Sequence, residues 1–440
     1  MWLLVESLSK RTQHTLVSTR NMSLNKLNIQ SVCSYFHIAC TLVLFCAIPF
    51  YYSPFIQYGL IFFFVSFVAD YLASKRWQEG FQWNASRVVS ALILLQFVLL
   101  FIFGLFEKDT RYLSTFYEMR TAYIGFGIVG LLGVSNKFKV RQFAYASALT
   151  IIPFLIILYN MLPPSFPNLE SIQDKINIIS QVRSQEICSH MTLNIFLCVG
   201  MILFSKVISI SKSNIEKAFS ISIILLFYIL VASTQGRVGL MNASIVLLFI
   251  ILRFATVKLK YLVPTLIVLL VGAVGLGVFL LSENPLKEDI KILNKANPRE
   301  YIWQDGVELI KESPIVGLGA STNALRVKER LLSNEELCSM ERFLIMHLKE
   351  EHVFGMHTHN QIMQSWQEYG LIGLFAILAL FIAILWLVKG SLSLSLLFLV
   401  IFIQLITEPI DGGVTAIGFC TYIYFMQVLL KSKQMGKITA

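Results

Sequence analysis

Long apolar stretches alternate with short polar segments along most of the chain. A helix needs about 20 apolar residues to cross a hydrocarbon core of roughly 30 Å, and runs near that length recur twelve times. Lipid offers the backbone no hydrogen-bond partners, so each run is predicted to be a helix. The predicted spans lie near residues 34–52, 54–74, 88–106, 119–135, 142–163, 189–209, 218–234, 238–254, 261–282, 370–388, 390–407 and 413–430.

This pattern predicts an all-α, polytopic transmembrane protein of about twelve spans. Spans one to nine occupy residues 34–282 and the last three occupy 370–430, while 283–369 form one large outer loop containing short helices. Residues 1–33 and 431–440 are the expected cytoplasmic N-terminal segment and tail. A start at Met22 rather than Met1 stays open.

Composition narrows the class of protein. Of 440 residues, 56% are hydrophobic and 14% are charged, whereas an ordinary soluble domain carries about 25% charged residues. This excludes a soluble enzyme of this length, a disordered chain and a disulfide-linked secreted scaffold. The seven cysteines form no Cys-x-x-Cys pair and are expected to be small apolar packing residues.

Basic residues indicate the orientation in the membrane, because Lys and Arg concentrate on the cytoplasmic side. With a cytoplasmic N-terminus and twelve spans, the short cytoplasmic segments hold more than half of the 36 Lys and Arg residues. Their acids are limited to Glu6, Glu79 and Glu216. The net charge of +10 is therefore explained by topology and requires no nucleic-acid partner.

The long loop 283–369 holds ten Lys and Arg residues and four of the seven His. Pro298 is typical of the first turn of a helix, and Pro314 is expected to end that helix. A second helix is predicted after Ser333, where Glu336 completes a capping box. The first helix is predicted to lie along the membrane interface on its apolar side, formed by Ile302, Trp303, Val307 and Ile310.

The first candidate for chemistry is Arg237, the only charge between two predicted spans. A charge beside lipid usually faces a water-filled cavity or a partner. The planar guanidinium binds phosphate oxygens bidentately and never deprotonates, which favours a fixed cation for a phosphate or diphosphate. The alternative is an arginine that merely extends to the membrane interface.

The second candidate pairs Arg299 with Trp303, one helical turn later. A cation in the first turn of a helix opposes the positive end of the helix dipole. A residue that breaks such a local rule hints at function. The alternative is a solvated arginine in a loop.

The third candidate is His357-Thr358-His359-Asn360, directly before the tenth span. Histidine accepts protons near neutral pH, so it is the natural general base at an outer membrane surface. One alternative is a metal site that adds His347, His352 and Cys338, although their spacings match no common zinc pattern. The other is capping and hydrogen bonding at a helix entrance.

In this order, the three segments resemble the O-antigen ligase and O-antigen polymerase superfamily of bacterial envelopes. The most specific pattern is a His, then Asn, Ser or Gln, then nine residues and Gly-x-x-Gly. Here His359-Asn360 precede residues 361–369 and Gly370-Leu371-Ile372-Gly373. Arg237 stands in Gly-Arg-Val-Gly where the family usually has Ser-Arg-Gly. The family's Arg…Trp…Pro-x-x-Gly-x-Gly segment is matched by Arg299, Trp303, Pro314, Gly317 and Gly319.

The resemblance, over roughly residues 215–430, implies glycosyl transfer at the periplasmic face of the bacterial inner membrane, without metal, cofactor or nucleotide sugar. It makes the outer loop 283–369 a periplasmic catalytic loop. The donor would be a glycan on undecaprenyl diphosphate. The acceptor would be a sugar hydroxyl of lipid A–core in a ligase, or another lipid-linked repeat unit in a polymerase. It implies His359 as general base and Arg237 and Arg299 as cations for the leaving diphosphate. Trp303, His357 and Asn360 would also bind substrate, and either of the last two would orient the His359 ring.

Two other classes stay open. A lipid or polysaccharide transporter would also have many spans, but usually with mid-bilayer charges and repeated halves. The predicted spans are nearly free of charge and no repeat is visible. A peptidoglycan glycosyltransferase of the shape, elongation and division type would show its own acidic outer-loop motif. No such motif is found in the sequence. The outer acidic turn Glu408-Pro409-Ile410-Asp411 stays a candidate, with a helix boundary as the alternative.

Overall fold

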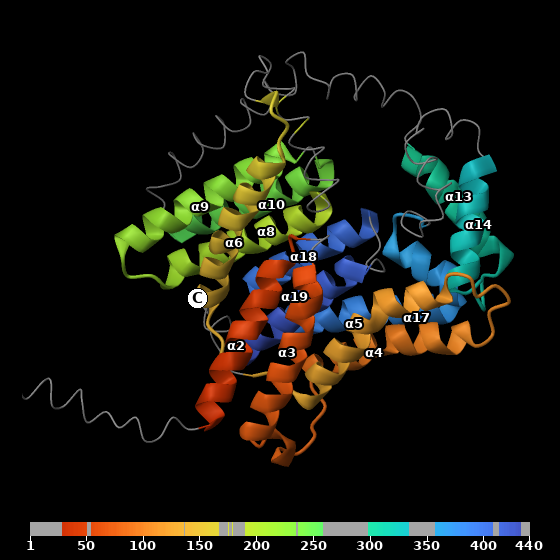
Figure 1. Cartoon of the computed structure of the whole chain (residues 1–440), viewed down its shortest axis with the longest axis horizontal. Helices are drawn as coiled ribbons and strands as arrows, with labels where there is room; N and C mark the ends of the chain where they lie inside the picture. Colours follow the sequence, from red (N-terminus) through yellow and green to blue (C-terminus); the bar gives the residue numbers. More distant parts are fainter. Residues whose placement is uncertain are drawn as a thin grey trace, which may run out of the picture.

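The computed structural model describes residues 29–50, 54–135, 137–166, 175, 178, 190–234, 236–257, 298–333, 357–407 and 413–432. Over these residues the protein is all-helical, as predicted (Figure 1). The helices before the long loop are α2 (Ile29–Ala47), α3 (Pro54–Ala73), η2 (Arg76–Gln78), α4 (Ala85–Gly104), α5 (Leu113–Leu132), α6 (Val140–Met161), α8 (His190–Ile210), α9 (Asn214–Ser233) and α10 (Arg237–Val257). The remaining helices are α13 (Pro298–Glu312), α14 (Ala320–Ser333), α17 (Gln361–Val388), α18 (Leu392–Thr407) and α19 (Gly413–Lys431).

Eleven of the twelve predicted runs coincide with these helices, and the run 261–282 lies outside the described residues. Seven described helices are long and apolar enough to cross a membrane. Shorter apolar stretches occur in α10, α18 and α19. The protein is therefore a helical membrane protein, while the count of twelve spans and their orientation stay predictions.

Helix α5 departs from the sequence-based expectation. It begins at Leu113, not near residue 119, and includes Glu118 and Arg120. The idea of nearly charge-free spans is wrong for this helix, because Arg120 is 1% exposed. The physical reason is a buried acidic partner on α17, which a reading of α5 alone does not reveal.

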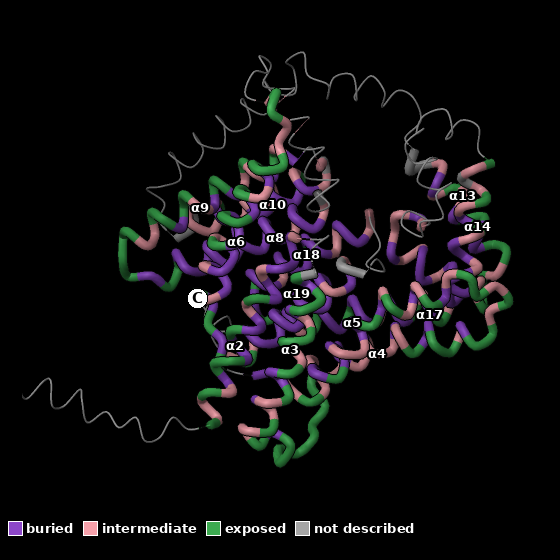
Figure 2. Tube along the Cα trace, viewed as in Figure 1, coloured by how far each residue is buried: buried purple, intermediate pink, exposed green. Residues whose placement is uncertain are grey.

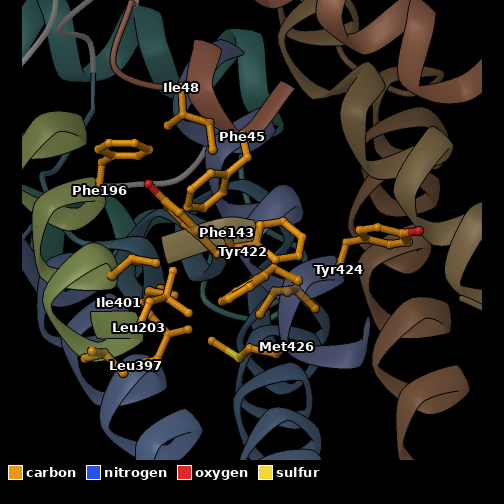
Figure 3. Packing of buried hydrophobic residues seen from close by; sticks show 14 of the residues in the cluster. Phe45, Ile48, Phe143, Phe196, Leu203, Leu397, Ile401, Tyr422, Tyr424 and Met426 are labelled. Carbon is orange, nitrogen blue, oxygen red and sulfur yellow. The ribbon is translucent and has the colours of Figure 1, made fainter. Parts of the chain in front are cut away.

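The main core lies where α2, α6, α8, α18 and α19 meet (Figure 1). Its centre is aromatic, with Phe45 in ring contact with Phe143, Phe196 and Tyr422 (Figure 3). Buried residues follow these contacts, while the outer faces of helices such as α9 are exposed (Figure 2). Outward apolar residues suit a surface covered by lipid.

Helices α13 and α14 form a separate pair that packs on α4, α5 and α17. A second apolar cluster joins them to the bundle through Ile302, Leu309, Ala320, Ala324 and Val327. The predicted helix after Pro298 is confirmed, but its buried side is only partly as expected, since Val307 is 44% exposed and Leu309 is buried. The buried side of α13 packs against neighbouring helices. These helix contacts explain an apolar stripe on α13 without contact with the membrane.

Helix α14 was not expected from the sequence. It ends at Ser333, whose hydroxyl donates to the Arg330 carbonyl at 2.9 Å. The second helix that the sequence predicts after Ser333 lies outside the described residues. Residues 320–333 are polar on average, so the sequence pattern does not indicate that Ala320, Ala324 and Val327 pack on the bundle.

Three basic side chains donate hydrogen bonds to carbonyls at the C-terminal end of α5. Arg76 donates to the Gly133 carbonyl at 2.6 Å and Arg87 to the Leu131 carbonyl at 3.0 Å. Lys431 donates to the Val134 carbonyl at 2.8 Å. Cations favour the negative, carbonyl end of a helix. Basic residues predicted to be cytoplasmic thus meet at the end of α5 farthest from α13 and α14.

Candidate functional site

The two glycine-containing motifs meet in space through backbone hydrogen bonds. Helix α17 is broken at Gly370, which has φ 60° and ψ −148°. Across the break, the amides of Leu318 and Gly319 donate to the carbonyls of Gln367 and Glu368 at 2.7 and 2.9 Å. In the opposite direction, the Leu371 amide donates to the Ile315 carbonyl at 3.1 Å. The loop thereby supplies partners that the interrupted helix lacks.

Glycine is required at this junction for two reasons. Gly317, Gly319 and Gly370 all have positive φ, which side chains disfavour. A Cβ on Gly370 would also lie 2.0 Å from the Ile315 carbonyl oxygen, and one on Gly317 would lie 2.5 Å from the Glu368 oxygen. The Gly-x-Gly and Gly-x-x-Gly patterns therefore form two halves of one tightly packed junction.

His359 lies just before this broken helix, at its entrance. Asn360 is the N-cap of α17, and its Oδ1 accepts from the amides of Ile362 and Met363 at 3.0 and 3.1 Å. His359 itself has φ 50°, an uncommon conformation for a residue other than glycine. Such local strain persists only where surrounding contacts hold it, and it occurs frequently at functional sites.

The neighbouring histidine helps to hold that conformation. The His359 amide donates to Nδ1 of His357 at 3.3 Å, and the two ring centroids are 4.3 Å apart. An Nδ1 that accepts a hydrogen bond carries no proton, so neutral His357 has its proton on Nε2 in this geometry. His357 is thus placed to orient the backbone of His359, whereas the Asn360 side chain is occupied by the helix cap.

Thr358, between the two histidines, anchors the turn to α17. It is buried, and its amide and hydroxyl donate to the Gln364 side-chain oxygen at 3.3 and 3.4 Å. Gln367, one turn further along α17, donates to the Gly306 carbonyl of α13 at 2.8 Å. These bonds connect the histidine turn, α17 and α13, so the helix that contains Arg299 and Trp303 is fixed to the same junction.

Beneath the junction lies a buried ion pair that the sequence reading did not identify. The Arg120 guanidinium donates to both Glu368 carboxylate oxygens, each at 2.8 Å, and also to the Tyr369 hydroxyl. Gln364 donates to the same carboxylate at 2.6 Å. An isolated charge in an apolar run was the available signal, because such charges are expensive and usually paired.

Glu107 makes a second unanticipated contact, at the start of α14. Its carboxylate accepts from the amides of Ala320, Ser321 and Thr322 at 2.7, 2.9 and 3.3 Å. A carboxylate there accepts from amides of the first helical turn that have no acceptor within the helix. Its negative charge also interacts favourably with the positive end of the helix dipole. Burial nevertheless raises the pKa of Glu107 above its ordinary value, which the three amide bonds oppose.

The two predicted phosphate-binding cations are only partly visible. Arg237 is the first residue of α10 and Arg299 lies in the first turn of α13, but both side chains lie outside the described residues. Helix α13 packs on α14 and α17, whereas α10 packs on α8, α9 and α18. The described contacts therefore join Arg299 to the His359 junction through its helix, and place Arg237 on a helix that packs on α18, which in turn packs on α17.

Trp303 is half-buried beside the second apolar cluster. Its indole nitrogen is buried without a hydrogen-bond partner among the described residues. The alternative metal site falls mostly on His347, His352 and Cys338, which lie outside those residues, as does the acidic turn 408–411. Where the structure is described, no group of three or more His, Cys, Asp or Glu residues is arranged to hold a metal ion.

These features define a helical membrane protein with a rigid, glycine-dependent junction that presents histidine at a helix entrance. The model of one protein family, described as O-Antigen ligase, matches residues 221–378, which include all three candidate segments. This match supports the O-antigen ligase-like superfamily that the resemblance indicated. No curated protein matches the chain.

Proposed function

We propose that this protein transfers a glycan from undecaprenyl diphosphate to a sugar hydroxyl at the periplasmic face of the inner membrane, as an O-antigen ligase acting on lipid A–core. The observation that carries the proposal is the joining of the two family motifs at one junction on α17, the helix that begins directly after His359 and Asn360. The family match supports this class of chemistry. The donor already carries a diphosphate leaving group, so the reaction needs no nucleotide sugar, and in the proposed mechanism arginine side chains take the place of a metal ion.

His359 acts as the general base in this proposal. It takes the proton from the acceptor hydroxyl while the hydroxyl oxygen forms a bond to the anomeric carbon. The bond between that carbon and the diphosphate oxygen breaks, and undecaprenyl diphosphate leaves with the electron pair. A single in-line displacement of this kind inverts the anomeric centre.

Arg237 and Arg299 stabilise the negative charge that develops on the diphosphate. Arginine suits this role because its fork matches phosphate oxygens and remains charged. Trp303 offers an indole donor and a ring face to the substrate, and its unpartnered nitrogen supports this assignment. His357 orients His359, and Asn360 contributes by fixing the entrance of α17.

The arrangement of charge supports a periplasmic site. Arg76, Arg87 and Lys431 gather at the end of α5 that the charge pattern assigns to the cytoplasm. The histidine junction contacts the opposite end of the same helix bundle through α14. A glycan donor and acceptor on the outer surface would reach that end without crossing the membrane.

Deletion of the gene followed by gel analysis of lipopolysaccharide tests the function. A ligase predicts loss of all ladder bands with accumulation of lipid-linked polymer. A core bearing only one repeat unit would instead establish the polymerase, which performs the same transfer on another lipid-linked unit. An unchanged profile would contradict both assignments and direct attention to another envelope polymer.

Complementation with variants tests the residues. His359→Ala and Arg237→Ala should each lower transfer on the order of 100- to 1000-fold, the usual cost of removing one such group. Arg237→Lys separates bidentate phosphate binding from simple charge, since lysine cannot form the fork. Near-normal ladders from His359→Ala in protein of normal abundance would refute the base assignment.

A further inference from the structure

Two short turns next to the glycine junction present large apolar side chains on the surface. Leu105 and Phe106 directly follow the last residue of α4, and Ile315 and Val316 lie in the turn between α13 and α14. All four are between 63% and 81% exposed. Large apolar residues exposed together indicate a surface that contacts a membrane, a protein or a ligand.

Both turns are tied to the same glycine segment, residues 317–319. Glu107 directly follows the first turn, and a Cβ on Gly319 would lie 2.4 Å from its side chain. In the second turn, the Ile315 carbonyl accepts from the Leu371 amide of α17 at 3.1 Å. The two apolar turns are therefore held at one end of the bundle, beside the junction.

The length of α4 relates the first turn to the thickness of a membrane. The helix has 20 residues, Ala85–Gly104, so it is about 30 Å long, the thickness of a hydrocarbon core. Just before it, the exposed rings of Phe81 and Trp83 contact each other with centroids 5.1 Å apart. Aromatic side chains concentrate at the two membrane interfaces. With these rings at one interface, Leu105 and Phe106 fall at the other.

Helix α17 gives the same boundary from the opposite direction. After the break at Gly370 it continues for about 18 residues, or roughly 27 Å, and Lys389 follows its last residue. One face of this part is exposed and apolar, and it consists of Ile372, Phe375, Ile382 and Trp386. Such a face, on a helix long and apolar enough to cross a membrane, is covered by lipid.

A ring contact shows that the two boundaries are level. Helices α4 and α17 pack side by side (Figure 1). Phe103, near the end of α4, meets Tyr369, directly before the break, with ring centroids 5.3 Å apart. The end of α4 and the break at Gly370 therefore lie at the same height, and so do the two apolar turns that adjoin them.

Polar and interfacial groups adjoin this level. Asp109 and Arg111, just after the first turn, form a surface ion pair at 2.7 Å. Beside the second turn, the Trp366 indole nitrogen donates to the Pro314 carbonyl at 2.9 Å. Tryptophan with a bonded indole and a partly exposed ring is typical of the zone between headgroups and hydrocarbon.

We propose that Leu105, Phe106, Ile315 and Val316 form an apolar rim that inserts among the acyl chains of membrane phospholipids, in the leaflet that the charge pattern places outside. The membrane contact expected for the long loop thus belongs to the turn between α13 and α14, while the apolar side of α13 packs on the bundle. The rim holds the glycine junction where headgroups meet hydrocarbon. This lipid contact is independent of the proposed transfer reaction.

Photocrosslinking in intact membranes tests the rim without an activity assay. The amino acid p-benzoylphenylalanine, which links to neighbouring C–H bonds under near-ultraviolet light, replaces Phe106 or Val316 in the full-length chain. Ile382, on the exposed face of α17, is the positive control. Glu329, whose side chain is exposed on α14, is the negative control. Each protein is irradiated in the membrane, purified and examined by intact-mass measurement.

The Phe106 and Val316 positions should both gain the mass of a phospholipid, in yields close to that at Ile382. The yield at Glu329 should be about tenfold lower, because a charged surface position lies outside the hydrocarbon. Yields at both rim positions as low as that at Glu329 would overturn the proposal. Crosslinks mainly to a second copy, seen as a doubled mass, would also overturn it and make the rim a protein interface. The replaced rim side chains are exposed and apolar, so normal abundance and unfolding temperature are expected for these variants.

Discussion

Arg120 of α5 and Glu368 of α17 form a two-pronged ion pair with both N–O distances at 2.8 Å. The residues are 248 positions apart in the sequence. Both side chains are almost completely buried. Because Glu368 also provides the carbonyl that accepts from Gly319, this pair connects the membrane bundle directly to the glycine junction on α17.

Removal of one member of this pair should be severely destabilising. Glu368→Gln leaves the Arg120 charge buried without a carboxylate, and breaking such a pair typically costs about 3–5 kcal/mol. The matched control is Glu329→Gln, because Glu329 pairs with Arg326 at 3.3 Å while both remain more than half exposed. That exposed pair should contribute less than about 1 kcal/mol.

Thermal unfolding of the purified proteins measures both effects. A large decrease for Glu368→Gln and a negligible one for Glu329→Gln are expected. Similar unfolding temperatures for the two variants would mean that the buried pair contributes no more than a surface pair. Transfer activity at a temperature where Glu368→Gln remains folded would then show whether the pair also positions the junction.

The junction should be intolerant of a single methyl group. Gly370→Ala places Cβ against the Ile315 carbonyl in a backbone conformation with positive φ, so the loop or the helix must move. The strain alone is worth about 1–3 kcal/mol. Gly390→Ala is the control, since nothing lies within 4 Å of its Cβ position.

Transfer activity and unfolding temperature are measured separately for Gly370→Ala and Gly390→Ala. Gly370→Ala should lose most transfer activity, because the loop or the helix must move to admit Cβ, and a shift of about 1 Å that reaches His359 can cost about 100-fold in rate. Gly390→Ala should retain both activity and unfolding temperature. If Gly370→Ala were as active as Gly390→Ala, the junction would have no role in placing the histidine.

Apolar periodicity is sufficient to predict the long membrane helices, but neither α14 nor the contacts between helices. Apolar runs predict α2 to α10 and α17 to α19 because lipid imposes a simple length rule. Helix α14 has no such run and owes its position to Glu107 and to apolar contacts with the bundle. Tertiary contacts of this kind have no signature in the local pattern.

The same limit applies to the site. The spacing of His359, Gly370 and Gly373 was visible in the sequence, as were the glycines at 317 and 319. That the two glycine segments bond to each other depends on a helix break, which no local pattern indicates. Arg120 was missed because its partner is distant in sequence, although its charge in an apolar run was a usable signal.

The cap of α17 should be replaceable by another capping residue. Asn360→Ala removes the acceptor of two amides and should cost about 1 kcal/mol, while Asn360→Ser retains an oxygen at the N-cap. Because the cap fixes the chain next to His359, Asn360→Ala should lower kcat and Asn360→Ser should restore it. A variant Asn360→Ser as inactive as Asn360→Ala would indicate that the amide contacts substrate instead.

Glu107 should make stability depend on pH in an unusual direction. Burial raises its folded-state pKa above the ordinary value of 4.5, and the charge of Glu368 acts in the same direction. Between these two pKa values the folded protein binds more protons than the unfolded chain. Its contribution to stability is therefore complete below about 4.5 and is lost as pH rises through the folded pKa.

Glu107→Gln isolates this effect, because glutamine keeps an acceptor for the α14 amides but does not titrate. Thermal unfolding of both proteins from pH 4 to 7 should show the wild type gaining on the variant as pH falls. Glu107→Ala should be less stable than both at every pH, by about 0.5–2 kcal/mol, because the first turn of α14 loses its cap. Parallel curves for wild type and Glu107→Gln would show that burial does not perturb this carboxylate, and that its three amide bonds fully offset the loss of water.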